Sequence, residues 1–280
     1  MVVTVENIFQ LGRRAAKGLS GTVGYREDGA VSLALGNEEP QCAAELVRLP
    51  EKPRFLHYHP VKSDTPEQVE ERITELHKRF PNLQIHGLSP AWLERNPGAL
   101  PSLRKAGLFS ISWFTGSVDG APEAPSQGWQ ALKSADIPKV ATFVYAPGVT
   151  RAQVEARVAE ILEGNPAVIL PLPRGLGDKI MLASATTDGI LDVSVLTWTR
   201  LACQGHTVRL RASWGALGWK MAQPTLAFGV NELAGWGLEE TLAYGPKARP
   251  GVLVGVDEVE SGIREVGRQP LGVSTCAWDC

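Results

Sequence analysis

Three histidines are spaced so that they could hold a metal ion. His57 and His59 stand two residues apart in the stretch LHYHP, so on a β-strand both side chains leave the same face. His86 falls in the next apolar stretch, at a similar height on the strand expected beside it. Imidazole nitrogens bind zinc, and a metal ion held in this way can activate water. The pattern therefore predicts one alternative function, a metal-dependent hydrolase.

The cysteines offer a second possible site. Cys42, Cys203, Cys276 and Cys280 are too few and too scattered for a secreted disulfide framework, so we expect reduced thiols. Cys276 and Cys280 in STCAWDC could form a metal site or a redox pair together with Cys42. The favoured alternative is two solvated thiols in a flexible tail, because the pair lacks a third close ligand.

Polar and aromatic residues also stand where apolar stretches end. The set that we predict to bind a ligand is His59, Tyr145, Arg174, Arg211, Trp214, Asn231 and Glu232. Guanidinium groups would bind a carboxylate, tryptophan would stack on a ring, and Tyr145 with Glu232 could do acid–base work. Arg209 and Arg211 share one face of a strand. If that face points inward the two cations need an anionic partner such as a ligand carboxylate, and if it points outward they are solvated.

Short apolar runs bounded by Pro, Gly or Asn predict the strands that must position these residues. Eight are expected, at 30–37, 54–61, 83–89, 108–114, 140–146, 167–173, 207–213 and 225–230. Helical periodicity lies between several of them, at 42–49, 66–80 and 151–162, the last two after the N-cap candidates Thr65 and Thr150. The alternation predicts an α/β fold, a (β/α)8 barrel of TIM type. A doubly wound open sheet would alternate in the same way, and only the count of eight favours the barrel.

Composition indicates a globular chain with a large core. The 280 residues are 44% hydrophobic and 21% charged, and we expect one barrel domain over 1–280, with an N-terminal helix in 1–25 and a C-terminal helix and tail in 256–280. The net charge of −2 argues against a nucleic-acid partner. No apolar stretch approaches the roughly 18 residues of a membrane span, and the first residues do not form a signal peptide. We therefore expect no membrane partner and a cytoplasmic location.

Several segments, in order along the chain, resemble one enzyme family. They are IHGLSP (85–90), LRKAGLFSI (103–111), VATFVYAPG (140–148), ILPLP (169–173), ASWGALG (212–218) and LAFGVNELAGWGLEE (226–240). Together they resemble the radical S-adenosylmethionine enzymes of the futalosine route to menaquinone, aminofutalosine synthase and dehypoxanthine futalosine cyclase, with the deazaflavin-cofactor synthase as a near cousin. The resemblance runs from about Val5 to Gly272 and implies a barrel with a 4Fe-4S cluster and S-adenosylmethionine (SAM).

The cofactor contacts that the resemblance implies are missing from the sequence. The family holds its cluster with a CxxxCxxC loop after the first strand, where this chain has only Cys42. A glycine pair that lets SAM approach is replaced by Leu56 and His57. A later glycine-rich turn has Trp113 and Phe114 at its glycine positions. The sequence therefore supports neither cofactor.

These observations lead to one main prediction. We expect a radical SAM-like barrel that has lost its cluster and SAM contacts, a pseudoenzyme related to menaquinone biosynthesis that acts as a small-molecule-binding, partner or regulatory protein. Its ligand would be nucleoside-like or an aromatic carboxylate, and it would form a homo-oligomer or a complex with an active relative. The alternative is an enzyme with replaced chemistry, such as the hydrolase that uses His57, His59 and His86.

Overall fold

The computed structural model describes residues 5–19, 21–26, 31–35, 55–60, 63–88, 90–118, 127–174, 187–244 and 254–272. The chain divides into two compact units. The first unit contains residues 1–28, 114–121 and 141–273, and the second contains most of the chain between them. The predicted single domain over 1–280 stays a prediction. Among the described helices, none has both the length and the apolar character that a membrane crossing requires.

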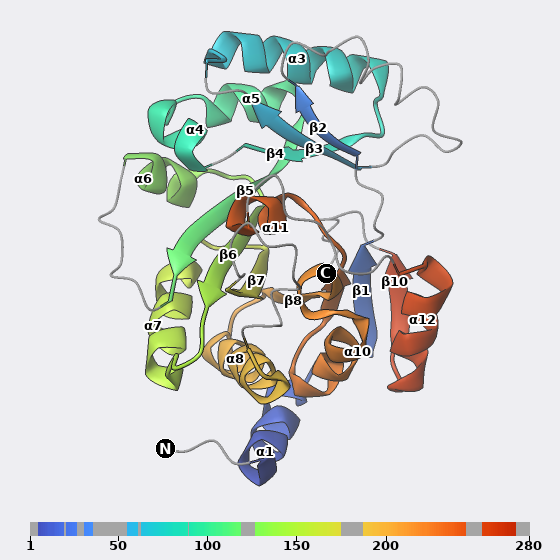
Figure 1. Cartoon of the computed structure of the whole chain (residues 1–280). Helices are drawn as coiled ribbons and strands as arrows, with labels where there is room; N and C mark the ends of the chain where they lie inside the picture. The colour runs from blue at the N-terminus through green and yellow to red at the C-terminus, as the bar shows by residue number, and fades with distance from the viewer. Residues whose placement is uncertain are drawn as a thin grey trace. The chain divides into compact units, whose positions relative to one another are not determined.

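The second unit consists of parallel strands and the helices that connect them (Figure 1). Its strands are β2 (Val31–Leu35), β3 (Phe55–Pro60), β4 (Gln84–Gly87) and β5 (Leu108–Ser117), whose last residues belong to the first unit. Its helices are α3 (Pro66–Arg79), α4 (Pro90–Arg95), α5 (Leu100–Ala106) and α6 (Gln127–Ser134). The hydrogen-bonded order is β5-β4-β3-β2, with parallel neighbours. Parallel neighbours need crossovers, and α3 joins β3 to β4 while α4 and α5 join β4 to β5.

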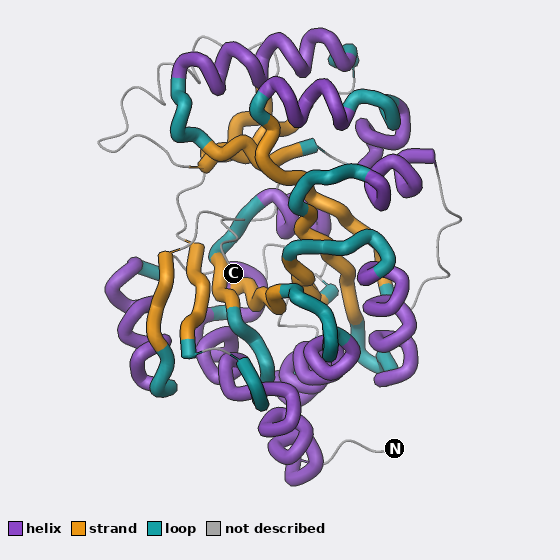
Figure 2. Tube along the Cα trace, turned by 180° about the vertical axis from the view of Figure 1, so that it is seen from behind, coloured by secondary structure: helices purple, strands orange, loops and turns teal. Residues whose placement is uncertain are grey.

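The first unit has the same alternation. Its strands are β1 (Thr22–Arg26), β6 (Lys139–Tyr145), β7 (Val168–Pro173), β8 (Arg209–Ser213), β9 (Glu232–Ala234) and β10 (Gln269–Gly272). Its helices are α1 (Val5–Ala16), α7 (Arg151–Leu162), α8 (Gly189–Ala202), α9 (Trp214–Leu217), α10 (Trp219–Ala222), η2 (Gln223–Phe228), α11 (Leu238–Tyr244) and α12 (Val256–Glu265). The strand order is β10-β1-β9-β8-β7-β6. Figure 2 shows this unit from behind, where α1 packs against α8 and η2.

One face of the first unit's sheet packs against helices. The apolar core on that face combines strand residues with residues of α8, η2 and α12, among them Val23, Leu196, Leu210, Ala212, Leu226, Leu233 and Ile263. Side chains alternate between the two faces of a strand. Arg211 and Ser213 of β8, together with Glu232 and Ala234 of β9, therefore lie on the opposite face. This second face is where polar side chains gather.

Much of the predicted secondary structure is confirmed. Helices lie at Pro66–Arg79 and Arg151–Leu162, and Thr65 and Thr150 each cap their helix in a reciprocal capping box with a glutamine three residues later. Seven of the eight predicted strands overlap strands β2 to β8. The helix predicted at 42–49 lies outside the described residues. The terminal predictions coincide in part with α1 and with α12.

The strand predicted at 225–230 is wrong. The first four of those residues belong to η2 (Gln223–Phe228), a 3-10 helix with Pro224 in its first turn and Gly229 at its C-cap, where φ is 101°. The strand itself, β9, begins at Glu232. Short apolar runs do not distinguish a strand from a buried helical turn, and Leu226 and Phe228 are buried as helical residues here. The strand end therefore lies four residues later than the sequence indicated, at Ala234 instead of Val230.

Candidate functional site

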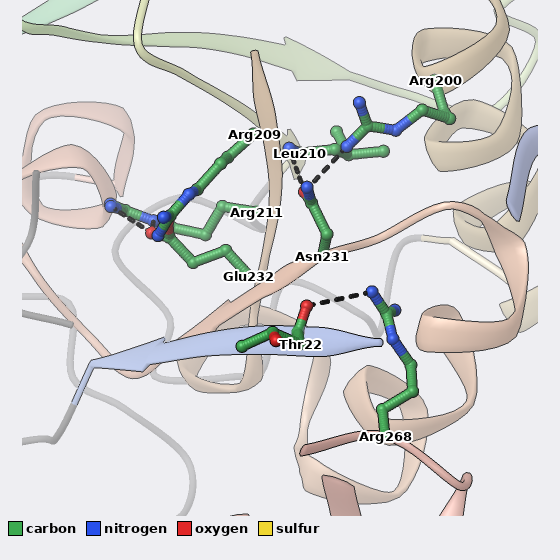
Figure 3. A network of polar contacts seen from close by, with 8 residues as sticks. All are labelled: Thr22, Arg200, Arg209, Leu210, Arg211, Asn231, Glu232 and Arg268. Carbon is green, nitrogen blue, oxygen red and sulfur yellow. Dashed lines mark hydrogen bonds and ion pairs between the residues drawn. The ribbon is translucent and has the colours of Figure 1, made fainter. Parts of the chain in front are cut away.

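Arg211 and Glu232 form a buried ion pair on the polar face of the first unit's sheet. They are opposite each other in the β8–β9 ladder, and both are 0% exposed. Nε and Nη2 of Arg211 each lie 2.5 Å from Oε1 of Glu232, and Nη1 of Arg209 lies 3.5 Å from Oε2 (Figure 3). The face that the two arginines share is therefore the buried one, and a protein carboxylate is their anionic partner. We call Arg211 and Glu232 the floor pair.

Small residues lie around the floor pair. Ser213 and Ala234 are opposite each other one layer nearer the C-terminal strand ends, on the same face. On the other side of Glu232, its partner in the β1–β9 ladder is Gly24, which has no side chain. In parallel barrels the C-terminal strand ends are where ligands bind. The floor pair thus lies beneath the part of the sheet in which a ligand is expected.

Asn231 fixes the start of β9. Its Oδ1 accepts hydrogen bonds from Nη2 of Arg200, at 2.7 Å, and from the backbone N–H of Leu210, at 2.8 Å (Figure 3). Its own backbone N–H donates to Leu210 O at 3.1 Å, and its carbonyl accepts from Gly24 N–H at 3.0 Å. Asn231 therefore joins α8, β8 and β1 directly beside Glu232. Its amide oxygen, predicted to bind a ligand, is used to hold the fold.

A second group of residues lies at the C-terminal strand ends of the same unit. Tyr145, the last residue of β6, donates its hydroxyl to Oδ1 of Asp192 at 2.8 Å, and both residues are 1% exposed. Burial raises the pKa of Tyr145 well above its ordinary value, and burial also raises the pKa of Asp192, against hydrogen bonds from Thr187 and Tyr145 that lower it. Tyr145 is therefore the hydrogen-bond donor of this pair and Asp192 the acceptor.

Arg174 follows β7 directly and is exposed. Its backbone N–H donates to Tyr145 O at 2.7 Å, and its Nη2 donates to Oγ of Ser117 at 2.7 Å. Ser117 is the last residue of β5. The guanidinium group is thus positioned at the ends of three strands, as the sequence predicted for a strand-end cation.

Sequence reasoning missed an aromatic pair in this region. The rings of Trp236, which follows β9, and Tyr244, the last residue of α11, have centroids 5.6 Å apart. Tyr244 donates its hydroxyl to Pro173 O, at the end of β7, over 2.6 Å. The available signal was the stretch GWG after an apolar run. We call Ser117, Tyr145, Arg174, Asp192, Trp236 and Tyr244 the rim.

Three predicted ligand residues, Asn231, Trp214 and His59, do not belong to the floor pair or the rim. Trp214 is buried in the apolar core on the helix-covered face, edge to face with Trp219 at 6.0 Å. Its role is therefore to pack the core. The side chain of His59 lies outside the described residues, and its backbone pairs with Ala34 in the β2–β3 ladder.

The predicted histidine site is a buried polar layer in the second unit. His57 and His86 are opposite each other in the β3–β4 ladder, both 0% exposed, with ring centroids 5.7 Å apart. Nδ1 of His86 lies 2.7 Å from Oγ of Ser110. Within the described ranges, no group of three or more His, Cys, Asp or Glu side chains could hold a metal ion. The side chain of His59 is not among the described residues, so the structure does not test the predicted set of three histidines.

The described residues do not fit the cluster and SAM that the resemblance implies. Leu56, His57 and Tyr58 of β3 are fully buried at the strand where the resemblance implies glycines. A cluster needs three thiolates. Cys203 is buried at the C-terminal end of α8, where burial raises the pKa of its thiol to about 11 and so opposes the thiolate. The other three cysteines, Cys42, Cys276 and Cys280, lie outside the described residues. The four cysteines of the chain do not contain the spacing CxxxCxxC.

Fold and site together define an α/β barrel with a polar site at the C-terminal strand ends. The solved structure of methylornithine synthase is similar to this chain, with a TM-score of 0.58 over 96% of this chain and 91% of that one, at 12% sequence identity. The predicted class, a (β/α)8 TIM-type barrel like that of radical SAM enzymes, is confirmed. No protein-family profile matches the chain.

The sequence relatives are named for one reaction. The chain is 30% identical over 222 residues to 5-amino-6-(D-ribitylamino)uracil–L-tyrosine 4-hydroxyphenyl transferase 1 of Methanosarcina acetivorans. The aligned residues cover 68% of this chain and 59% of the transferase. Transferase 2 of that organism is 25% identical over 232 residues, 72% of this chain and 60% of the transferase. The Methanocaldococcus jannaschii transferase is 35% identical over 88 residues, 31% of this chain and 24% of that protein. The chain thus spans at most 60% of these relatives.

The predicted link to menaquinone is wrong. These relatives are named for a ribitylaminouracil and L-tyrosine, and none of them for a futalosine compound. The prediction of a menaquinone-related pseudoenzyme is wrong for the same reason. Its basis was a set of segments that build strands β4 to β9 and several of the helices beside them, and such segments preserve the packing of a barrel, which proteins with different substrates share.

Proposed function

We propose that this chain binds the small molecules on which its transferase relatives act, an aminopyrimidine with a polyol chain and L-tyrosine. The observation that supports the proposal is the placement of the floor pair and the rim on one unit, at and beneath its C-terminal strand ends. Together they combine a carboxylate, guanidinium groups and a phenol. Polar groups of this kind that converge at strand ends are typical of ligand sites in parallel barrels.

The floor pair suits the aminopyrimidine. A uracil ring with an added amino group presents N–H donors beside carbonyl acceptors. Glu232 has one carboxylate oxygen bonded to Arg211, while its Oε2 makes, among the described residues, one long contact of 3.5 Å to Nη1 of Arg209. Oε2 can therefore accept N–H groups from the ligand, in a charge-assisted hydrogen bond.

Arg174 suits the carboxylate of L-tyrosine. Its guanidinium group is exposed at the rim and already oriented by Ser117. Arginine binds carboxylates through two parallel hydrogen bonds, so a partly fixed side chain gives both affinity and orientation. The backbone of Arg174 is fixed by the buried Tyr145–Asp192 pair, because the Arg174 N–H donates a hydrogen bond to the carbonyl of Tyr145.

We propose that these residues act without an iron–sulfur cluster, because the described side chains do not fit one. The proposal therefore concerns recognition and orientation of the substrates, and no chemical step is derived. A homo-oligomer, a complex with an active relative and a cytoplasmic location stay predictions from the sequence.

Calorimetric titration of the purified chain with 5-amino-6-(D-ribitylamino)uracil and with L-tyrosine tests the proposal. We expect Glu232→Gln to weaken binding of the aminopyrimidine and Arg174→Gln to weaken binding of tyrosine, each by about 10- to 100-fold, the value of a charged hydrogen bond. Glu258→Gln, on the exposed face of α12, is the matched control. The proposal is wrong if the folded wild-type chain binds neither compound.

A further inference from the structure

Trp236 differs from the tryptophans of the core. Trp92, Trp113 and Trp214 are at most 1% exposed, whereas Trp236 is half-buried, two residues beyond the end of β9. We infer that Trp236 binds the ring of the aminopyrimidine by stacking and so determines specificity for a flat heterocycle. This inference rests on the proposed function and adds a residue to its site.

The turn that contains Trp236 is fixed to the neighbouring strand end. A Cβ atom on Gly215, in α9, would lie 3.0 Å from the backbone N of Trp236 and 3.2 Å from its Cα, so a larger residue there would push the Trp236 backbone away. Oγ of Ser213, the last residue of β8, donates to Gly235 O at 3.4 Å. The backbone of Trp236 is therefore held at the C-terminal ends of β8 and β9.

The indole ring is held as well. Its Nε1 donates to Oγ of Thr241 at 3.3 Å, and the Thr241 hydroxyl donates to Gly237 O at 2.9 Å. The Tyr244 ring packs beside it at an interplanar angle of 36°, and the Tyr244 hydroxyl is bonded to Pro173 O at the end of β7. An aromatic ring fixed before the ligand arrives loses little conformational entropy on binding.

The position and chemistry of Trp236 match a flat polar heterocycle. A half-buried ring at the strand ends has surface for contact, and the floor pair lies on the same unit beneath those ends. Nucleobase rings stack on aromatic side chains whatever their hydrogen-bonding pattern, so stacking on Trp236 and hydrogen bonds to Glu232 act on different parts of one ligand. Trp236 would select for a planar ring, while the floor pair would select for its polar edge.

Titrations with 5-amino-6-(D-ribitylamino)uracil and with L-tyrosine on four chains test this inference: the wild type, W236F, W236L and the control W219F. Trp219 is partly buried against the helix-covered core. We expect W236L to weaken aminopyrimidine binding roughly 5- to 150-fold, the range of one base–aromatic stack. W236F, which keeps a ring, and W219F should stay within a few-fold of wild type. Tyrosine binding should change less than aminopyrimidine binding in W236L.

Indole fluorescence gives a second measurement that does not depend on W236L folding. The chain has 8 tryptophans, and if Trp236 stacks on the ligand then most of the change in emission on binding comes from that residue. W236F should bind the aminopyrimidine but lose most of this change, while W219F keeps it.

The outcomes separate the two proposals. Absence of binding by the folded wild type contradicts the proposed function itself. If the wild type binds and folded W236L binds equally well, or W236F keeps the full fluorescence change, the role of Trp236 is wrong and the proposed function stands. Equal losses for tyrosine and aminopyrimidine in W236L would mean that Trp236 holds the rim together without recognising the ring, which also overturns the inference.

Discussion

Arg211 and Glu232 stabilise the fold as an ion pair and were also predicted to bind a ligand. Arg211 and Glu232 hold each other in the interior, and breaking a buried ion pair by removing one partner costs about 3–5 kcal/mol, because the other charge is left buried. The sequence predicted both residues as ligand contacts, but nothing in it indicated that they are opposite each other in one ladder. Spacing within a strand defines a shared face, whereas pairing between strands depends on register.

Asp192 is expected to make stability depend on pH. Burial raises its pKa, so the folded chain binds this proton more tightly than the unfolded chain, whose Asp pKa is roughly 3.9. Its stabilising contribution is therefore complete below that value and is lost as pH rises through the raised pKa. In urea unfolding from pH 4 upward, the wild type should lose stability relative to Asp192→Asn. Parallel pH profiles for the two chains would contradict the expected role of burial.

At the scale of elements, periodicity in the sequence predicted the helices that are determined by interactions between residues close together in the chain. Capping boxes and apolar stripes are local, and α3 and α7 were found from the sequence with their caps. The end of β9 was not found from the sequence, because the apolar run that includes η2 was interpreted as the strand. That four-residue error also concealed part of the site, because strand-end residues were sought at Asn231 and Glu232, and Trp236 lay beyond the expected end.

The junction of α8, β8 and β1 is expected to depend on Asn231. Asn231→Ala removes the acceptor of two buried donors, Arg200 Nη2 and Leu210 N–H, and should lower the free energy of unfolding by about 1–3 kcal/mol for each donor left unsatisfied. Asn231→Asp keeps an acceptor and should cost less. Urea unfolding measures both, with the exposed Asn82→Ala as control. Equal stability of Asn231→Ala and wild type would show that the junction is held by other contacts.

At the scale of the whole molecule, the sequence predicted the barrel but not the class of relatives. The collinear segments and the alternation of strands and helices predicted the barrel correctly, as the likeness to methylornithine synthase shows. The substrates could not be predicted in this way, because residues that pack a barrel do not depend on the ligand. The relatives, which are named for a ribitylaminouracil and L-tyrosine, contradict the predicted link to menaquinone.

A chain without cluster ligands is expected to hold little iron. After anaerobic reconstitution with iron and sulfide, followed by desalting, the protein should bind far less than four iron atoms per chain and should not cleave SAM, since a 4Fe-4S cluster needs three spaced thiolates. Iron and sulfide assays with absorption near 400 nm measure this. A stable four-iron cluster that survives desalting would contradict the expectation and return the cofactor to the site.

The strand pairing of the first unit also sets the order in which the chain can assemble. Strand β1 has β9 and β10 as its ladder partners, and Arg268 donates to Thr22 O across a sequence separation of 246 residues. During synthesis β1 leaves the ribosome long before either partner exists. Contacts so distant in sequence form slowly, because a long loop must close first. The contacts of β1 with β9 and β10 are therefore expected to form among the last in the newly made protein, whereas the floor pair joins residues only 21 positions apart.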